Sequence, residues 1–96
     1  MRLSVFVIYD AAAEAYLPPF YFHQPAQAWR EFAIRCNDPS SPFHHSPGDY
    51  TVFQIGYWDD ETAVFHQHEQ EKLVNGVEAA SYFNADNFNT EDPTNA

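Results

Sequence analysis

The chain has 96 residues, a formal net charge of −10 and a hydrophobic content of 45%. A chain of this length forms one domain with a small core, so its nine Phe, six Tyr and two Trp must supply much of the buried area. The sequence has no run of about 18 apolar residues that would span a bilayer, and residues 1–10 are too short and too acidic at their end for a signal peptide. We therefore expect a cytoplasmic protein without a membrane partner.

Charge is distributed unevenly along the chain. Residues 1–48 hold four acids and three arginines, whereas residues 49–96 hold ten acids against Lys72 alone. Non-specific nucleic-acid binding draws on about six to ten contacts between basic side chains and phosphates, and this chain has four basic residues in all. The composition disfavours direct DNA binding by a monomer, although a dimer would combine Arg30 and Arg35 of two copies in one patch.

The first quarter of the chain predicts two strands separated by a loop. Residues 3–9 are a nearly continuous apolar run, typical of a strand buried on both faces, and we expect this strand at the centre of the sheet. Residues 10–19 predict a loop or a single helical turn, because the two prolines at the end of this segment stop a helix. Residues 20–23 are aromatic and bounded by prolines, which indicates a brief edge strand.

One clear helix follows. It begins at Pro25, which suits the first helical position because the N–H that proline lacks is not needed there. Arg30 and Arg35 are expected on the solvent side, with Arg35 paired to Glu31, and contact with phosphate is the alternative role for the two arginines. The helix ends before residues 37–49, which read as a loop. Its buried stripe has the i, i+3, i+4, i+7 spacing and consists of Trp29, Phe32, Ala33 and Cys36.

Residues 50–67 predict a β-hairpin. Residues 50–58 alternate with the period of a strand, the acids at 59–61 form the turn, and residues 62–67 return as the second strand. Gly56 is expected to leave a gap or a bulge. Phe53 and Ile55 are expected to face the helix.

The rings of this hairpin suggest self-association. One helix covers only one face of a sheet, so aromatic side chains on the other face would need a partner surface. We therefore expect a homodimer. The expected interface residues are Tyr50, Val52, Trp58, Val64 and His66.

The remainder of the chain is less regular. Residues 69–83 have loosely helical spacing that the Asn75-Gly76 turn signal interrupts. Residues 84–96 are polar and acidic, and we expect them to form a disordered tail. The sequence thus predicts a single α+β domain over residues 1–83, with a small antiparallel sheet in a ββαββ-like order and one covering helix.

Two segments carry a resemblance to a known family. The segment FYFHQPAQAWREF places Ala28, Arg30 and Phe32 two residues apart, and an acidic-aromatic core follows it. Over residues 3–65 the chain resembles the small nonstructural proteins of gokushovirus-like microviruses, which are tailless single-stranded DNA phages. The resemblance implies an accessory role in genome replication, or in the switch to packaging, inside the host cytoplasm. The core consists of Asp49, Tyr50, Val52, Phe53, Ile55, Gly56, Tyr57 and Asp59.

The sequence does not point to an enzyme. Cys36 is the only cysteine and falls on the buried helix stripe, so neither a disulfide nor a CxxC site is expected. No nucleophile motif or phosphate-binding loop occurs. His66 and His68 are expected on the same side of a strand, and the loop pair His44-His45 would complete a metal site. Such a site needs three or four convergent ligands, and nothing in the sequence shows that this loop folds back onto the hairpin. We expect no catalytic residues, no metal and no cofactor. The five histidines are His23, His44, His45, His66 and His68.

Two functions then remain. In the first, the protein contacts phage replication or assembly proteins, and its negative surface steers it to basic partners. In the second, a dimer binds single-stranded DNA by base stacking and arginine contacts. The chain has fewer basic residues than the resemblance implies, and this argues against DNA binding. Its candidate residues are Arg30, Arg35, Tyr50, Tyr57 and Trp58.

Overall fold

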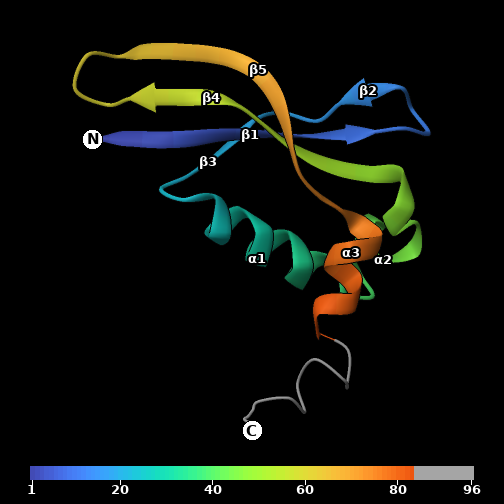
Figure 1. The fold of residues 1–96 in the computed structure, drawn as a ribbon. Coiled ribbons are helices and arrows are strands. Elements are labelled where there is room, and N and C mark those ends of the chain that lie inside the picture. The colour runs from blue at the N-terminus through green and yellow to red at the C-terminus, as the bar shows by residue number, and fades with distance from the viewer. Residues whose placement is uncertain (84–96) are drawn as a thin grey trace, which may run out of the picture.

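The computed structural model describes residues 1–83, and the acidic tail expected over residues 84–96 lies outside the described residues. The chain forms an antiparallel sheet with helices on one side, which confirms the α+β prediction (Figure 1). Its elements in chain order are β1 (Arg2–Asp10), β2 (Ala15–Tyr16), β3 (Phe20–Phe22), α1 (Pro25–Cys36), α2 (Pro42–His45), the 3₁₀ turn η1 (Pro47–Asp49), β4 (Tyr50–Asp59), β5 (Val64–Asn75), α3 (Gly76–Ala80) and the 3₁₀ turn η2 (Ser81–Phe83).

The strand order is β2-β1-β4-β5, and β3 also pairs with β1. β1 is thus the central strand, as its continuous apolar run predicts. Both β2 and β3 pair antiparallel with β1, at opposite ends of that strand. The edge-strand prediction for residues 20–23 is confirmed by β3, whereas β2 was not expected.

α1 packs its apolar stripe against one face of the sheet. Ala28, Phe32, Ala33 and Cys36 are buried, which confirms three of the four predicted stripe positions. Trp29 is half-buried and lies at the margin of the core. The sheet contributes its own buried side chains to this core, namely Phe6, Ile8, Val52 and Val74.

The prediction that Phe53 faces the helix is wrong, and Ile55, for which the same was expected, lies in a bulge. Val52 is opposite Ile8 in the register and is fully buried in the helix-side core. Phe53 is opposite Val7, which places it on the other face of the sheet. The register then shifts at Ile55. This residue has no partner on β1 and none on β5, the two strands that flank β4. This bulge reverses the alternation along the second half of β4.

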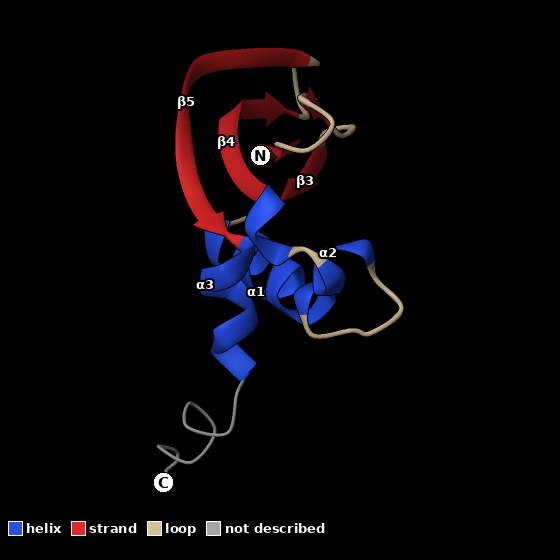
Figure 2. Ribbon diagram, turned by 90° about the vertical axis from the view of Figure 1, so that its right-hand side faces the viewer, coloured by secondary structure: helices blue, strands red, loops and turns tan. Residues whose placement is uncertain are grey.

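The sequence suggested that the second face of the sheet is open. In the structure the sheet curls over this face (Figure 2). Val5 and Val7, which point away from the helices, are only 2% and 7% exposed. Strands at opposite ends of the strand order meet across this concave face, where the Tyr16 hydroxyl donates to Gln70 Oε1 at 3.3 Å and accepts from Gln70 Nε2 at 3.2 Å. The sheet therefore buries much of its second face by itself.

Three segments differ from the sequence expectation. Residues 37–49 contain α2 and η1, in addition to loop. β5 runs to Asn75, far beyond the expected end at residue 67, because its polar residues still form a ladder with β4. Asn75 then begins α3, where its side chain accepts from the Val77 N–H at 2.9 Å.

Candidate interaction surfaces

The two helix arginines lie on different surfaces of the protein. Arg30 and Arg35 are five residues apart, which separates them by about 140° around α1. Arg30 borders a shallow hollow that also contains Trp29 and Leu73. Arg35 borders a groove on the β3 side of the helix, together with Phe20. The structure does not bring the two cations together.

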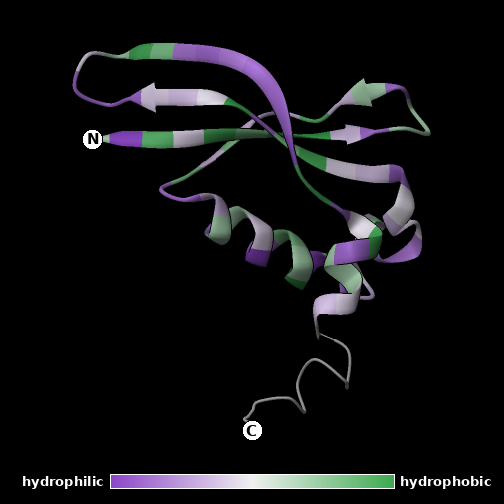
Figure 3. Cartoon of the chain, in the orientation of Figure 1, coloured by the Kyte–Doolittle hydropathy of each residue, from purple (hydrophilic) through white to green (hydrophobic). Residues whose placement is uncertain are grey.

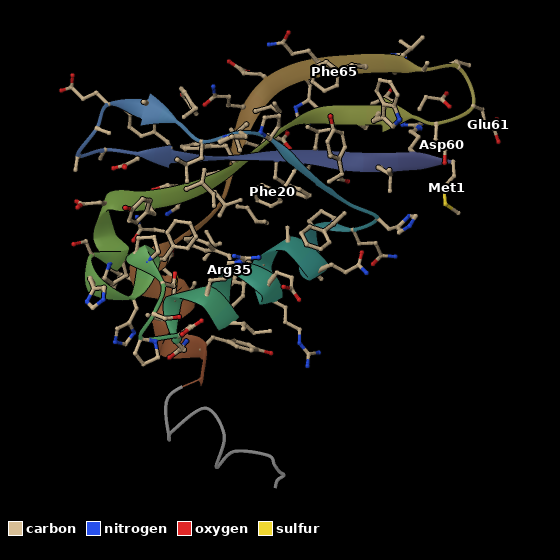
Figure 4. All side chains as sticks on the ribbon, turned by 180° about the vertical axis from the view of Figure 1, so that it is seen from behind. Met1, Phe20, Arg35, Asp60, Glu61 and Phe65 are labelled. Atoms are coloured by element: carbon tan, nitrogen blue, oxygen red, sulfur yellow. The ribbon has the colours of Figure 1, made fainter. Side chains whose placement is uncertain are left out.

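An apolar groove lies between α1 and β3, in the region of Phe20 and Arg35 (Figure 4). Its volume is about 270 Å³, which suits one or two side chains of a partner better than a cofactor of ordinary size. Arg35 extends from α1 towards Phe20, and Glu31 shares the same rim. The expected ion pair of Glu31 with Arg35 is absent from the ion pairs of residues 1–83. Further lining comes from Ile8, Leu17, Pro18, Tyr21, Phe22, Phe32 and Phe43.

Tyr57 and Trp58 point to opposite faces, because they are adjacent on β4. Tyr57 is enclosed by side chains of both neighbouring strands: the His66 ring is stacked on it at 4.6 Å between centroids, and the Arg2 guanidinium carbon is 4.3 Å from its ring centre. Trp58 is opposite Leu3 in the register. These two rings therefore do not form one stacking platform.

Tyr50 and Val52 belong to the core. The Tyr50 ring contacts Phe43 edge-on at 4.7 Å between centroids and packs against the helix-side cluster. Burial raises the pKa of its hydroxyl, and the nearby carboxylates of Asp10 and Asp49 act in the same direction. Val52 is 0% exposed, so it cannot reach a partner in the folded monomer. Both were expected at an interface; Val52 instead lies in the core, whereas Tyr50 is partly buried and packs against that core.

The tip of the hairpin is held by the amino terminus. The Met1 amine forms a salt bridge of 2.7 Å to Asp60 and one of 3.4 Å to Glu61 (Figure 4). The hydrogen bond to Asp60 is the main cause that raises the pKa of the Met1 amine above its usual value. Two of the three acids that were expected to form this turn therefore pair with the amino terminus.

The outer edge of β5 is the longest unprotected strand edge among residues 1–83. β5 is last in the strand order, and between Val64 and Lys72 every residue but His68 is exposed. Figure 3 shows that this strand is hydrophilic along most of its length. Of the expected interface residues, Val64, which is 42% exposed, and His66 lie on this strand.

The histidines are dispersed. His44 and His45 lie on α2, and the His44 ring is 3.0 Å from the Cys36 carbonyl oxygen. His68 instead contacts the neighbouring Glu69 carbonyl oxygen at 2.8 Å. Within residues 1–83 no group of three or more His, Cys, Asp or Glu is placed to hold a metal ion. Burial raises the pKa of the Cys36 thiol to about 11, so this side chain is a neutral core residue.

Comparison with known families assigns the chain. The model of the family described as Phage ORF5 protein matches residues 3–79, from β1 into α3. The chain belongs to the Phage ORF5 protein family. No curated protein and no solved structure gives a significant match.

The ORF5 match extends beyond residues 3–65, where the sequence resemblance was seen, and includes the whole of β5. None of the helices in residues 1–83 is long and apolar enough to cross a membrane. The features that sequence reasoning missed in this ORF5 chain are the groove beside β3 and the length of β5. The strand lacks apolar alternation over residues 66–72, and the groove depends on a contact between α1 and β3 that no local pattern records.

Proposed function

We propose that this ORF5 protein is an accessory nonstructural protein that acts through protein contacts, in single-stranded DNA replication or in the switch to packaging. The role follows from the resemblance to microvirus proteins, and the place of action is the host cytoplasm. Its proposed partners are replication or assembly proteins of the phage.

The separation of the cations is the observation that carries the proposal. Arg2 covers Tyr57 at one end of the sheet, whereas Arg30 and Arg35 lie on different sides of α1. Lys72 is paired with Glu78 at 3.3 Å. A strand of DNA needs basic groups along one track, and separated single cations among many acids do not supply one.

The groove beside β3 supports the same proposal. Its apolar floor suits a side chain from a partner, and the negative surface around it would steer a basic protein towards it. Arg35 and Glu31 at the rim provide one charge of each sign for orienting that partner.

The alternative, a dimeric single-stranded DNA binder, makes an opposite prediction in a simple titration. We expect a fluorescent single-stranded oligonucleotide to remain free at micromolar protein, both at about 50 mM and at about 200 mM salt. Tight binding that weakens steeply with salt would establish the alternative and contradict the proposal.

A second experiment tests the protein contact directly. The replication initiator and the capsid protein of the same phage are each purified and titrated with the ORF5 protein. We expect one of them to bind, and we expect Arg35→Glu to weaken binding by roughly tenfold. Arg30→Glu is the matched control, because it makes the same charge change on the other side of α1. Absence of binding to both proteins contradicts the proposal.

A further inference from the structure

The outer edge of β5 has the form of a surface that recognises a copy of itself. It is the free edge of the sheet in residues 1–83, and its N–H and C=O groups have no strand beside them. Such an edge is a template for another strand. The other end of the strand order is different, because β2 and β3 are two and three residues long and prolines separate them.

The side chains of this edge are complementary to those of a second copy that runs in the opposite direction. Residues 66–71 read His-Gln-His-Glu-Gln-Glu. An antiparallel pair in one register sets His66 against Glu71 of a second copy, and His68 against Glu69 of that copy. Moving the register by one position either way would set His68 against His68, or Glu69 against Glu69. The charges thus favour one register over its neighbours.

β5 also bulges where its residues 68–70 have no partner on β4, and this bulge makes the register possible. Opposed residues in an antiparallel pair share a face, yet two residues five positions apart on a regular strand lie on opposite faces. Here His66 is opposite Tyr57 of β4, which is opposite Ser4 of β1. Likewise, Glu71 is opposite Gln54 of β4, which is opposite Phe6 of β1. Ser4 and Phe6 are two apart on β1 and lie on one face, so His66 and Glu71 also share a face.

The same rule holds for the two glutamines of the segment. Gln67 is opposite Gly56 of β4, which is opposite Val5 on the concave face of the sheet. Gln70 reaches Tyr16, which is opposite Tyr9 on that same face. The two glutamines therefore lie on the concave face, and His66 and Glu71 lie on the opposite face. Antiparallel pairing of two β5 edges requires opposed residues to share a face in this way.

We propose that the protein forms a symmetric dimer in which the β5 edges of two copies pair antiparallel over residues 66–71, in this register. The surface differs from the one expected from the sequence, because the sheet covers its own second face. The bulge and the charges, which protect an edge against arbitrary strands, here select a second copy of this chain. The proposal does not depend on the proposed role in replication or packaging.

Charge exchange tests it. One variant carries His66→Glu and His68→Glu, and the other carries Glu69→Lys and Glu71→Lys. In its own dimer the first variant opposes Glu to Glu and the second opposes Lys to His, whereas a mixed pair opposes Glu to Lys or Glu to His at each of these positions. By sedimentation we expect the wild type to be a dimer, each variant alone to have a Kd raised roughly tenfold or more, and the equimolar mixture to regain the dimer.

The control changes the same charges elsewhere. Glu14→Lys with Glu31→Lys matches the second variant in net charge, and both residues are exposed and lie outside β5, so we expect an unchanged dimer. Circular dichroism establishes that each variant is folded. A monomeric wild type at high concentration, variants that dimerise like the wild type, or a mixture that stays monomeric would each overturn the proposal.

Discussion

The two halves of the β4–β5 hairpin differ in how strongly the rest of the protein holds them. At the base, Val52 and Val74 are 0% and 1% exposed and pack beneath the helices. In the distal half, Val64 and Phe65 are each 42% exposed and only β1 lies beside the pair. The base of the hairpin therefore anchors the sheet to the helices, whereas its far end leaves the outer edge of β5 exposed.

The largest effect is expected at the base, for Gly76→Ala. A Cβ at this position would overlap the carbonyl group of Pro47, which is backbone and has little room to move. We expect a loss of about 3 kcal/mol in the free energy of unfolding, measured by chemical denaturation. Gly48→Ala is the control, because its Cβ would lie at an ordinary 3.5 Å from Val77 and should change stability little. Equal effects of the two changes would contradict this account of the base.

The second effect concerns Asn75, which joins the end of β5 to three other segments. Its Nδ2 donates to Gly48 O at 3.2 Å, to Tyr50 O at 3.2 Å and to Thr51 Oγ1 at 3.0 Å, and its side chain also caps α3. Asn75→Ala removes the cap and the three bonds, so we expect a loss of about 2 kcal/mol in a denaturation experiment.

Asn37→Ala provides the matched comparison. Asn37 also lies at a helix end, but its Nδ2 donates a single hydrogen bond within residues 1–83, to Ala33 O at 2.8 Å. A loss of less than about 1 kcal/mol is expected. If the Asn37 change proved as costly as the Asn75 change, the special role of the hairpin base would be refuted.

These predictions separate what local sequence reveals from what it hides. β1 and α1 were predictable because an apolar run and a helical spacing are local patterns. The extension of β5 was not, because its residues 66–72 are polar and pair with β4 only on either side of the unpaired residues 68–70. The curl of the sheet depends on Tyr16 and Gln70, which are 54 positions apart. The site predictions followed the same limit: Tyr50 and Val52 were placed on a surface because the alternation along residues 50–58 does not show which face of the strand the helix covers.

At the hairpin tip we expect a smaller effect, and a gain. Ala63 adopts a left-handed conformation with φ of 61°, which is unfavourable for a residue with a Cβ. Ala63→Gly should therefore raise the free energy of unfolding by about 0.5 to 1 kcal/mol, seen as a higher melting temperature. A lower melting temperature would show that the methyl group of Ala63 contributes contacts that outweigh its backbone strain.

The smallest effect is the pH dependence of the Met1 salt bridges. The pKa of this amine is raised in the folded protein, so its contribution to stability is full below about pH 8 and is lost as the pH rises through the folded value. We expect the melting temperature to fall from pH 7 to pH 10 slightly more in the wild type than in the Asp60→Asn, Glu61→Gln variant. Parallel curves would show that the two bridges contribute nothing in solution.

The central claim is that the far half of this hairpin is a contact surface and its base is not. Amide hydrogen exchange at low and high micromolar protein tests it most directly. We predict that residues 64–71 exchange more slowly at the high concentration, while residues 25–36 of α1 exchange at the same rate in both samples. Exchange along β5 that does not depend on concentration, or protection that appears on α1 instead, would contradict the claim.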